Sequence, residues 1–191
     1  GGGKSLCYQF PALYQGGVTL VISPLRSLIV DQVESLNKKN IKSAYVFGDL
    51  DEEYLNNVYD NLNSNSPDIN LLYTTPETLD LNNSFKLTLE ELYKNGYLSR
   101  IVIDEVHCLS LWGHEFRPSY LQLYKLRDRF PEVPFMGLTA SATPKVESDV
   151  KTLLKFSDSE TEIINEHSNC KTYSDSFYRS NLKIEIRRIV N

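Results

Sequence analysis

Five short apolar runs alternate along the chain with longer, more polar segments, and this alternation limits the possible folds more than any other feature. The runs are VTLVIS, AYVF, INLLYT, RIVIDE and PFMGLT, at 18–23, 44–47, 69–74, 100–105 and 134–139. Several are apolar at consecutive positions, which is typical of strands covered on both faces. Between them the sequence predicts helices over 5–14, 25–38, 51–62, 85–95, 118–129 and 144–154. Strands alternating with helices predict an α/β fold, with a mostly parallel sheet and helices on both faces.

The composition excludes several classes of protein. With 191 residues the chain fits one domain, and no apolar run reaches the roughly 18 residues that span a bilayer. No secretory signal pattern is present, so we expect an intracellular protein without a membrane partner. The three cysteines, Cys7, Cys108 and Cys170, lack the paired spacing of a zinc site and suit a reducing compartment. Because the net charge is −5, any contact with nucleic acid must come from local groups.

The C-terminal part of the sequence is less regular. Residues 157–176 are polar and poorly periodic, which indicates a surface insertion. In the tail, Leu182, Ile184 and Ile186 alternate with charged residues, so the sequence predicts a strand that is half exposed to water.

The first five residues resemble the end of a phosphate-binding loop. Gly1, Gly2 and Gly3 precede Lys4 and Ser5, which is how a phosphate-binding loop ends where a helix begins. In such a loop, glycine amides hold the phosphates, the lysine reaches the β- and γ-phosphates and the hydroxyl contacts Mg²⁺. The loop normally follows a buried strand, which this sequence does not show. The alternative is that the glycines are a remnant of cloning.

Two adjacent carboxylates supply the complementary half of such a site. Asp104 and Glu105 directly follow the apolar run RIVI, and ligands collect at the carboxyl ends of parallel strands. Mg²⁺ takes one or two carboxylates and keeps its waters, so Asp104 could hold the metal and Glu105 could activate the attacking water. The alternative is that the pair only marks a strand that ends in acidic surface residues, which is common for an isolated Asp-Glu pair. Together with the phosphate loop, however, the pair indicates a nucleoside triphosphatase and argues against the cloning remnant.

A second strand delivers small hydroxyl residues to the same edge of the predicted sheet. The stretch LTASATP places Ser141 and Thr143 just beyond the run at 134–139. Thr143 precedes Pro144 and is also a good helix cap. The hydroxyl residues can lie at the ligand edge while Thr143 also caps the helix.

The stretch HCLSLWGHEFRPSY is the most specific feature of the chain. It contains the only tryptophan, Trp112, with His114, Phe116 and Arg117, and it carries glycine and proline where a core segment would show periodicity. Aromatic rings interleaved with cationic side chains suit stacking on the bases of a nucleic-acid strand. The alternative is that Trp112 packs in a small core beneath the loop.

These motifs resemble those of RecQ-type DNA helicases of superfamily 2. GGGKSLCYQFPAL resembles the end of motif I, VISPLRSLIVDQV motif Ia, YTTPETL motif Ib, IDEVHC motif II and LTASATP motif III. CLSLWGHEFRPSY resembles the aromatic-rich loop that distinguishes RecQ proteins from other helicases. The sequence departs from the family pattern at Val106, Leu111 and Glu115, where alanine, glutamine and aspartate are usual.

The resemblance implies a RecA-like P-loop NTPase domain, without the strand before the phosphate loop, in an ATP-dependent 3′-to-5′ DNA helicase. It implies ATP and Mg²⁺ as cofactors, and single-stranded DNA and duplex junctions as partners. The implied nucleotide residues are Gly1, Gly2, Gly3, Lys4, Ser5, Asp104 and Glu105. His107 would link the nucleotide site to the DNA, together with Ser141 and Thr143. The residues implied in DNA sensing or along the DNA backbone are Trp112, His114, Phe116, Arg117, Ser23, Pro24, Thr75 and Pro76.

By the same resemblance, residues 1–180 form the first motor lobe and 181–191 begin a linker or a second lobe. We expect a nuclear protein of DNA repair, recombination and replication if the source is eukaryotic. Two alternatives stay open. One is another superfamily 2 ATPase, such as an RNA helicase. The other is a truncated, inactive module that only binds nucleic acid or a partner.

Overall fold

The computed structural model describes residues 3–112, 116–156 and 170–174 and contains a five-stranded parallel sheet. The strand order is β2-β3-β1-β4-β5, and every paired neighbour runs parallel. The strands are β1 (Val18–Ile22), β2 (Ser43–Val46), β3 (Leu71–Thr74), β4 (Leu98–Ile103) and β5 (Phe135–Gly137). Each predicted run therefore forms a strand, and the predicted parallel α/β fold is confirmed.

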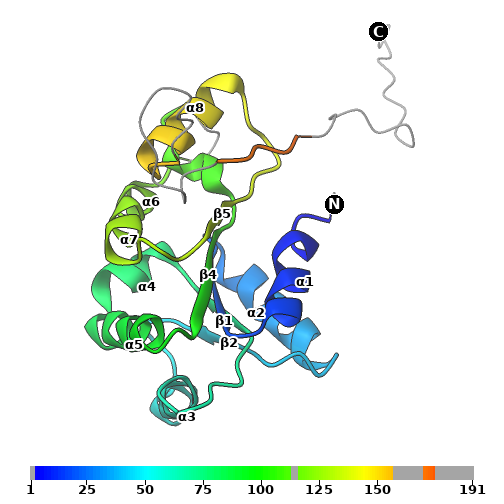
Figure 1. The fold of residues 1–191 in the computed structure, drawn as a ribbon, viewed down its shortest axis with the longest axis vertical. Coiled ribbons are helices and arrows are strands. Elements are labelled where there is room, and N and C mark those ends of the chain that lie inside the picture. Colours follow the sequence, from blue (N-terminus) through cyan, green and yellow to red (C-terminus); the bar gives the residue numbers. More distant parts are fainter. Residues whose placement is uncertain (1–2, 113–115, 157–169, 175–191) are drawn as a thin grey trace, which may run out of the picture.

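Helices cover both faces of this sheet (Figure 1). The helices are α1 (Leu6–Gln15), α2 (Arg26–Asn37), α3 (Glu52–Leu62), α4 (Pro76–Leu81), α5 (Asn83–Lys94), α6 (Pro118–Leu121), α7 (Tyr124–Arg129) and α8 (Pro144–Leu153), with a 3-10 helix η1 (Val106–Leu109). The single helix expected over 118–129 is wrong in detail. It is two short helices, because the backbone between them forms i-to-i+3 hydrogen bonds such as Leu123 N to Tyr120 O.

The two faces of the sheet have separate cores. Side chains alternate along a strand, so in β1 Leu20 and Ile22 face one side while Val21 faces the other. The first side packs against α3, α5, η1 and α8, and the second against α1 and α2. Burial on both faces explains why the central strands are apolar at consecutive positions.

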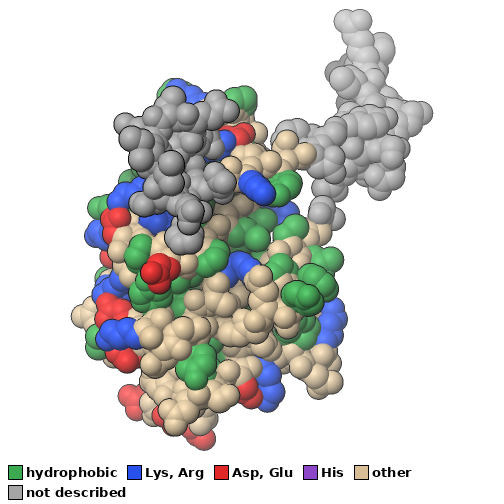
Figure 2. All heavy atoms as spheres, in the orientation of Figure 1, with side chains coloured by type: hydrophobic (Ala, Val, Ile, Leu, Met, Phe, Trp, Pro, Cys, Tyr) green, Lys and Arg blue, Asp and Glu red, His purple; other side chains and the backbone are tan. Residues whose placement is uncertain are grey.

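One face of α1 is apolar and exposed. Tyr8 and Ala12 are buried against the sheet, whereas the opposite face carries exposed Leu6, Phe10, Leu13 and Tyr14. Figure 2 shows hydrophobic side chains gathered over α1. Within the described residues nothing covers this face.

The strand register brings four strand ends to one edge of the sheet. Ile22 of β1 lies opposite Thr74 of β3 and Ile103 of β4, and Ile103 lies opposite Gly137 of β5. The residues that follow these strands therefore emerge side by side. This is the edge at which an open parallel sheet binds ligands.

Some expectations fall outside the described residues. The predicted strand over 182–187 and most of the predicted insertion over 157–176 belong to this group. Residues 170–174 have no regular secondary structure. No helix in the described ranges is long and apolar enough to cross a membrane.

Candidate nucleotide site and the loop beside it

The predicted phosphate loop leads directly into α1. Gly3 has a φ of 73°, in the left-handed region that favours glycine, and its carbonyl accepts a hydrogen bond from Leu6 N at 3.0 Å. A Cβ at Gly3 would meet no atom within 4 Å, so the backbone conformation and not the available space accounts for the glycine. Gly1 and Gly2 lie outside the described residues. Lys4 and Ser5 follow Gly3 at the start of the helix, as a phosphate loop requires.

Lys4 contacts the acidic end of β4. Its Nζ lies 2.7 Å from Glu105 Oε1, although the two residues are 101 positions apart in the sequence. Both side chains are about one-third exposed, so water and a ligand can reach the pair. The fold therefore brings together the two halves of the predicted nucleotide site, and the alternative of isolated surface acids does not describe this strand end.

Glu105 has an unusual backbone conformation. Its φ of 48° and ψ of 46° are in the left-handed region, which a residue with a long side chain adopts only when its surroundings enforce it. Asp104 N donates to Ile22 O and Val106 N donates to Leu138 O, both at 2.8 Å, so the strand edge clamps the turn from both sides. The turn aims the Glu105 carboxylate between Lys4 and His107, whose Nδ1 lies 3.3 Å from Oε2.

Asp104 is held by the hydrogen bonds of its turn. Its Oδ1 accepts a hydrogen bond from Glu105 N at 3.0 Å, and its carbonyl accepts one from the buried Tyr120 Oη at 3.0 Å. Burial raises the pKa of the Asp104 carboxyl above its ordinary value, and the neighbouring Glu105 raises this pKa further. A half-buried carboxylate in this situation favours the arrival of a positive charge.

Asp104→Asn is expected to raise the melting temperature by a few degrees at pH 7 in the presence of a chelator. The folded-state pKa of Asp104 lies above the unfolded value, so the folded state holds more protons between the two values and stability falls as pH rises through that window. The variant removes this destabilisation. Thermal melts of both proteins at pH 7 measure it, with Asp60→Asn on the exposed surface of α3 as the matched control. A lower melting temperature for Asp104→Asn would contradict the effect of burial.

His107 connects Glu105 to the end of β5. The imidazole is buried, and its Nδ1 lies 2.9 Å from Thr139 Oγ1. The same hydroxyl accepts a hydrogen bond from Ser141 N at 3.1 Å. Thr143 accepts a hydrogen bond from Val146 N at 3.3 Å and caps α8, as the sequence predicts. A polar chain thus runs from the carboxylate through His107 toward α8.

The loop after η1 exposes its tryptophan. Trp112 has 64% of its surface accessible, so the alternative of Trp112 in a small core does not describe this structure. Lys145 Nζ of α8 lies 3.3 Å from the centroid of the Trp112 ring. Phe116 is half-buried, and His114 lies outside the described residues. The exposed Trp112 ring of the predicted DNA-sensing stretch is therefore beside a cation.

Arg117 connects this loop to the end of β1. Its Nη1 donates to the carbonyl of Pro24 at 3.1 Å, and its backbone N donates to Cys108 O at 3.0 Å. Ser23 and Pro24 are both buried at this strand end. The loop and the segment that resembles motif Ia are thereby joined.

The segment that resembles motif Ib begins a helix. Thr75 Oγ1 accepts from Thr78 N at 3.3 Å and caps α4, and Pro76 occupies the first turn. Thr75 and Pro76 are both buried, so the exposed groups at this strand end belong to the residues that follow them, such as Glu77. Glu77 accepts a hydrogen bond from Ser119 Oγ at 2.7 Å, which ties α4 to α6.

Sequence reasoning missed three residues that support the site. Tyr120 holds the Asp104 turn, Thr139 bonds His107, and Asp149 accepts a hydrogen bond from the buried Ser110 Oγ at 2.5 Å. Only Thr139 gave a signal, because it ends a predicted strand at the ligand edge. Tyr120 ends the stretch HCLSLWGHEFRPSY, but nothing in that stretch indicated its contact with Asp104, and Asp149 lies on a helix without a local motif.

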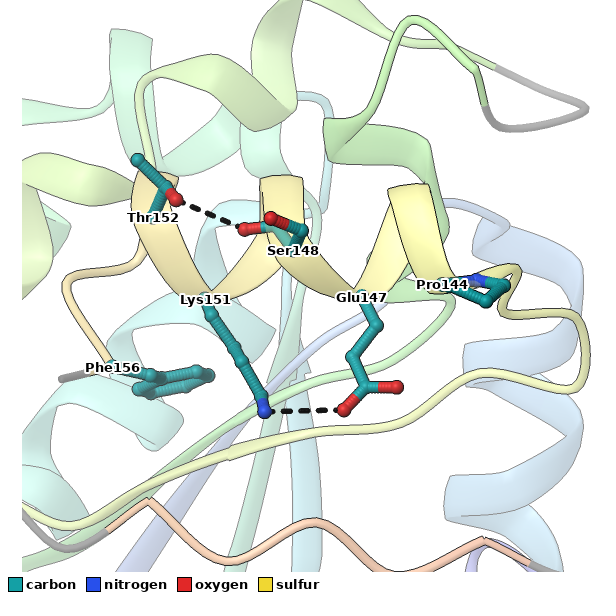
Figure 3. Close-up of a pocket in the computed structure, with 6 residues that line it drawn as sticks. All are labelled: Pro144, Glu147, Ser148, Lys151, Thr152 and Phe156. Atoms are coloured by element: carbon teal, nitrogen blue, oxygen red, sulfur yellow. Dashed lines mark hydrogen bonds and ion pairs between the residues drawn. The ribbon is translucent and has the colours of Figure 1, made fainter. Parts of the chain in front are cut away.

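A shallow pocket of about 330 Å³ lies elsewhere, along α8 (Figure 3). Its lining residues are Pro144, Glu147, Ser148, Lys151, Thr152 and Phe156. Two of these residues, Lys151 and Glu147, form an ion pair at 3.1 Å. The pocket does not include any predicted nucleotide residue.

Comparison with known proteins agrees with this geometry. The DEAD/DEAH box helicase family matches residues 1–150. This chain belongs to that family. The RecQ-like DNA helicase BLM of Xenopus laevis is 45% identical over 186 residues, which are 97% of this chain and 13% of that protein. The predicted resemblance to RecQ-type helicases is thereby confirmed.

Two further relatives carry names of the same kind. The ATP-dependent DNA helicase hus2/rqh1 of Schizosaccharomyces pombe is 45% identical over 191 residues, or 98% of this chain and 14% of that protein. The ATP-dependent DNA helicase Q1 of Rattus norvegicus is 39% identical over 188 residues, which are 98% of this chain and 28% of that protein. The chain therefore spans less than a third of each of these relatives.

Solved structures show the same fold. The crystal structure of the DUF1998 helicase MrfA superimposes with a TM-score of 0.60 at 22% identity, covering 81% of this chain and 25% of that one. The Hef helicase domain of Pyrococcus furiosus superimposes with a TM-score of 0.52 at 22% identity, covering 80% of this chain and 31% of that one. With the parallel sheet and the phosphate loop, these likenesses confirm the predicted helicase-type P-loop NTPase fold.

Proposed function

We propose that this chain is the first motor lobe of a RecQ-type, ATP-dependent DNA helicase that unwinds DNA in the 3′-to-5′ direction. The observation that carries the proposal is the contact of Lys4 with Glu105 at 2.7 Å. This contact unites a phosphate loop with an acidic strand end. The relatives of highest identity among those described above are named as RecQ-like or ATP-dependent DNA helicases.

The residues at this edge fit ATP and Mg²⁺. Ser5 and Asp104 offer the hydroxyl and carboxylate oxygens that Mg²⁺ prefers, and burial disfavours an ionised Asp104 without a cation. Among the described residues, no group of three or more His, Cys, Asp or Glu side chains could hold a metal by itself. A nucleotide-bound Mg²⁺ needs only one or two carboxylates, since phosphates and water supply its other ligands.

Lys4 would exchange partners when nucleotide binds. Magnesium-bound ATP supplies the phosphoanhydride bond that is hydrolysed and the negative charge that Lys4 neutralises. A γ-phosphate oxygen would compete with Glu105 Oε1 for the Lys4 ammonium, so phosphate binding would weaken the ion pair and leave the Glu105 carboxylate available to the attacking water. Glu105 can then accept a proton from the attacking water, while His107 keeps its orientation.

The DNA would lie along the loop at Trp112 and the ends of β1 and β3. Arg117 joins the loop to the segment at Ser23 and Pro24, which gives a structural route between DNA and the nucleotide edge. We assign residues 1–180 to this lobe and 181–191 to a linker or second lobe, and a second RecA-like lobe would complete the ATP site. We further propose a nuclear role in DNA repair, recombination and replication for this chain, whose relatives are named as DNA helicases.

The choice of nucleic acid tests the proposal. ATP hydrolysis by the full-length protein is expected to rise with added single-stranded DNA and to respond weakly to RNA of the same sequence. A steady-state phosphate-release assay with matched oligonucleotides measures both. Stimulation by RNA alone would favour the alternative of an RNA helicase. An inactive module would instead show no saturable, Mg²⁺-dependent binding of fluorescent ATP.

Trp112→Ala is expected to reduce DNA stimulation of the ATPase by about ten-fold while leaving the melting temperature unchanged. Base stacking on an aromatic ring contributes roughly 1–3 kcal/mol per base, and a ring that is 64% exposed leaves little cavity on removal. The measurement is an ATPase titration with single-stranded DNA beside a thermal melt. Tyr173→Ala, which removes an aromatic ring that is 87% exposed outside the loop, is the matched control. A large fall in melting temperature with normal stimulation would contradict the DNA role of Trp112.

A further inference from the structure

A cation from α8 covers part of the exposed tryptophan ring. Lys145 Nζ lies 3.3 Å from the centroid of Trp112, well inside the distance of about 6 Å at which an ammonium is attracted to a ring face. Both side chains are exposed, and 64% of the surface of Trp112 stays accessible. The pair is therefore an aromatic surface and a positive charge presented together to solvent.

No acid in the described ranges forms an ion pair with Lys145. Its position also opposes helix stability, because it follows Pro144 in the first turn of α8, where the helix dipole disfavours cations. Glu147 in the same turn is paired with Lys151 at 3.1 Å. The charge of Lys145 is thus left for a ligand outside the helix.

The same helix holds the loop that carries Trp112. Ser110 Oγ donates to Asp149 Oδ2 at 2.5 Å and accepts from Trp112 N at 3.1 Å. Asp149 is one turn from Lys145 on α8, so α8 fixes both the backbone of Trp112 and the cation on its ring. The relative position of ring and charge is consequently set before any ligand arrives, which lowers the entropy lost on binding.

We propose that Lys145 is a DNA-contacting residue that acts with Trp112 as one unit, the ring stacking on a base and the ammonium binding an adjacent backbone phosphate. This inference rests on the proposed function and adds a residue on α8 to the DNA site. Single-strand binding sites combine stacking rings with cations that follow the backbone. Because the chain carries a net charge of −5, such a local cation has no general positive field to replace it.

The test measures the binding of a fluorescein-labelled oligo-dT to the full-length protein across a salt series. Lys145→Met is expected to weaken binding by about ten-fold at low salt, as for loss of one hydrogen bond to a charged group. The slope of log K against log salt is expected to fall by about 0.7, the value for one phosphate contact on a single strand. Methionine keeps an apolar stem over the ring, so the variant removes the charge and retains the packing.

Two variants serve as controls. Lys145→Arg is expected to restore both the affinity and the salt slope, because arginine keeps the charge and stacks on rings. Lys125→Met removes one exposed positive charge from α7 and is expected to change neither.

The outcomes separate the inference from the proposed function. If the unmodified protein does not bind oligo-dT, the proposed function fails and the inference fails with it. If that protein binds and Lys145→Met binds with the same affinity and slope, only the assignment of Lys145 is overturned. Equal losses in Lys145→Met and Lys125→Met would likewise overturn it, since the effect would then come from net charge.

Discussion

Lys4→Ala is expected to lower the rate of ATP hydrolysis by at least about 100-fold. Lys4 is the cation of the proposed phosphate loop, and removing a group that stabilises transition-state charge reduces kcat by about 10²–10³. The folded structure is expected to persist, because the side chain is 30% exposed and its described contact is the ion pair with Glu105. Steady-state ATPase assays with a thermal melt measure both expectations.

Lys94→Ala is a matched control for this variant. Lys94 also forms an ion pair at 2.7 Å, with Glu91 on the exposed face of α5, so its removal breaks the same kind of contact away from the site. It is expected to leave the ATPase rate unchanged. Turnover of Lys4→Ala at the rate of the unmodified protein would refute the assignment of the phosphate loop.

Glu105→Gln is expected to bind Mg²⁺-ATP with near-normal affinity and to hydrolyse it at least about 100-fold more slowly. Glutamine keeps the shape of glutamate and can still accept a hydrogen bond from Lys4, but it cannot take a proton from water. The strained backbone at this position is unchanged, since both residues meet the same penalty at a φ of 48°. Equilibrium binding of fluorescent ATP and single-turnover hydrolysis separate affinity from rate.

Glu91→Gln on α5 is the corresponding control, because it removes a carboxylate from a surface ion pair of the same length. A collapse of ATP affinity in Glu105→Gln, with a normal rate per bound ATP, would show that the roles proposed for Asp104 and Glu105 are wrong.

The sheet could be predicted because each of its strands leaves a local pattern in the sequence. Burial on both faces demands continuous apolar runs, and each of the five runs became a strand. The strand ends were also predictable, since parallel strands deliver their next residues to one edge. The break between α6 and α7 could not be predicted. The periodicity over 118–129 fits a single helix, and no residue there indicates the 3-10 turn at Leu123.

The candidate nucleotide site was only partly predictable, because some of its residues belong to sequence motifs and others are brought in by tertiary packing. Motif spacing placed Lys4 near Glu105, and the structure gives their contact. The supports of the site depend on packing between distant elements, as when Tyr120 of α6 reaches the carbonyl of Asp104. The glycine and proline around Trp112 indicated that it is not a core residue, but the approach of Lys145 to its ring is a property of tertiary structure that no local pattern of residue types encodes.

Strand separation with a tailed duplex tests the central proposal most directly. The full-length protein, given ATP and Mg²⁺, is expected to unwind a DNA duplex that carries a 3′ single-stranded tail. It is expected to leave a duplex with a 5′ tail intact, and Lys4→Ala is expected to unwind neither. Unwinding of the 3′-tailed duplex without ATP hydrolysis, or no unwinding by a protein whose ATPase responds to DNA, would contradict the assignment as a DNA helicase.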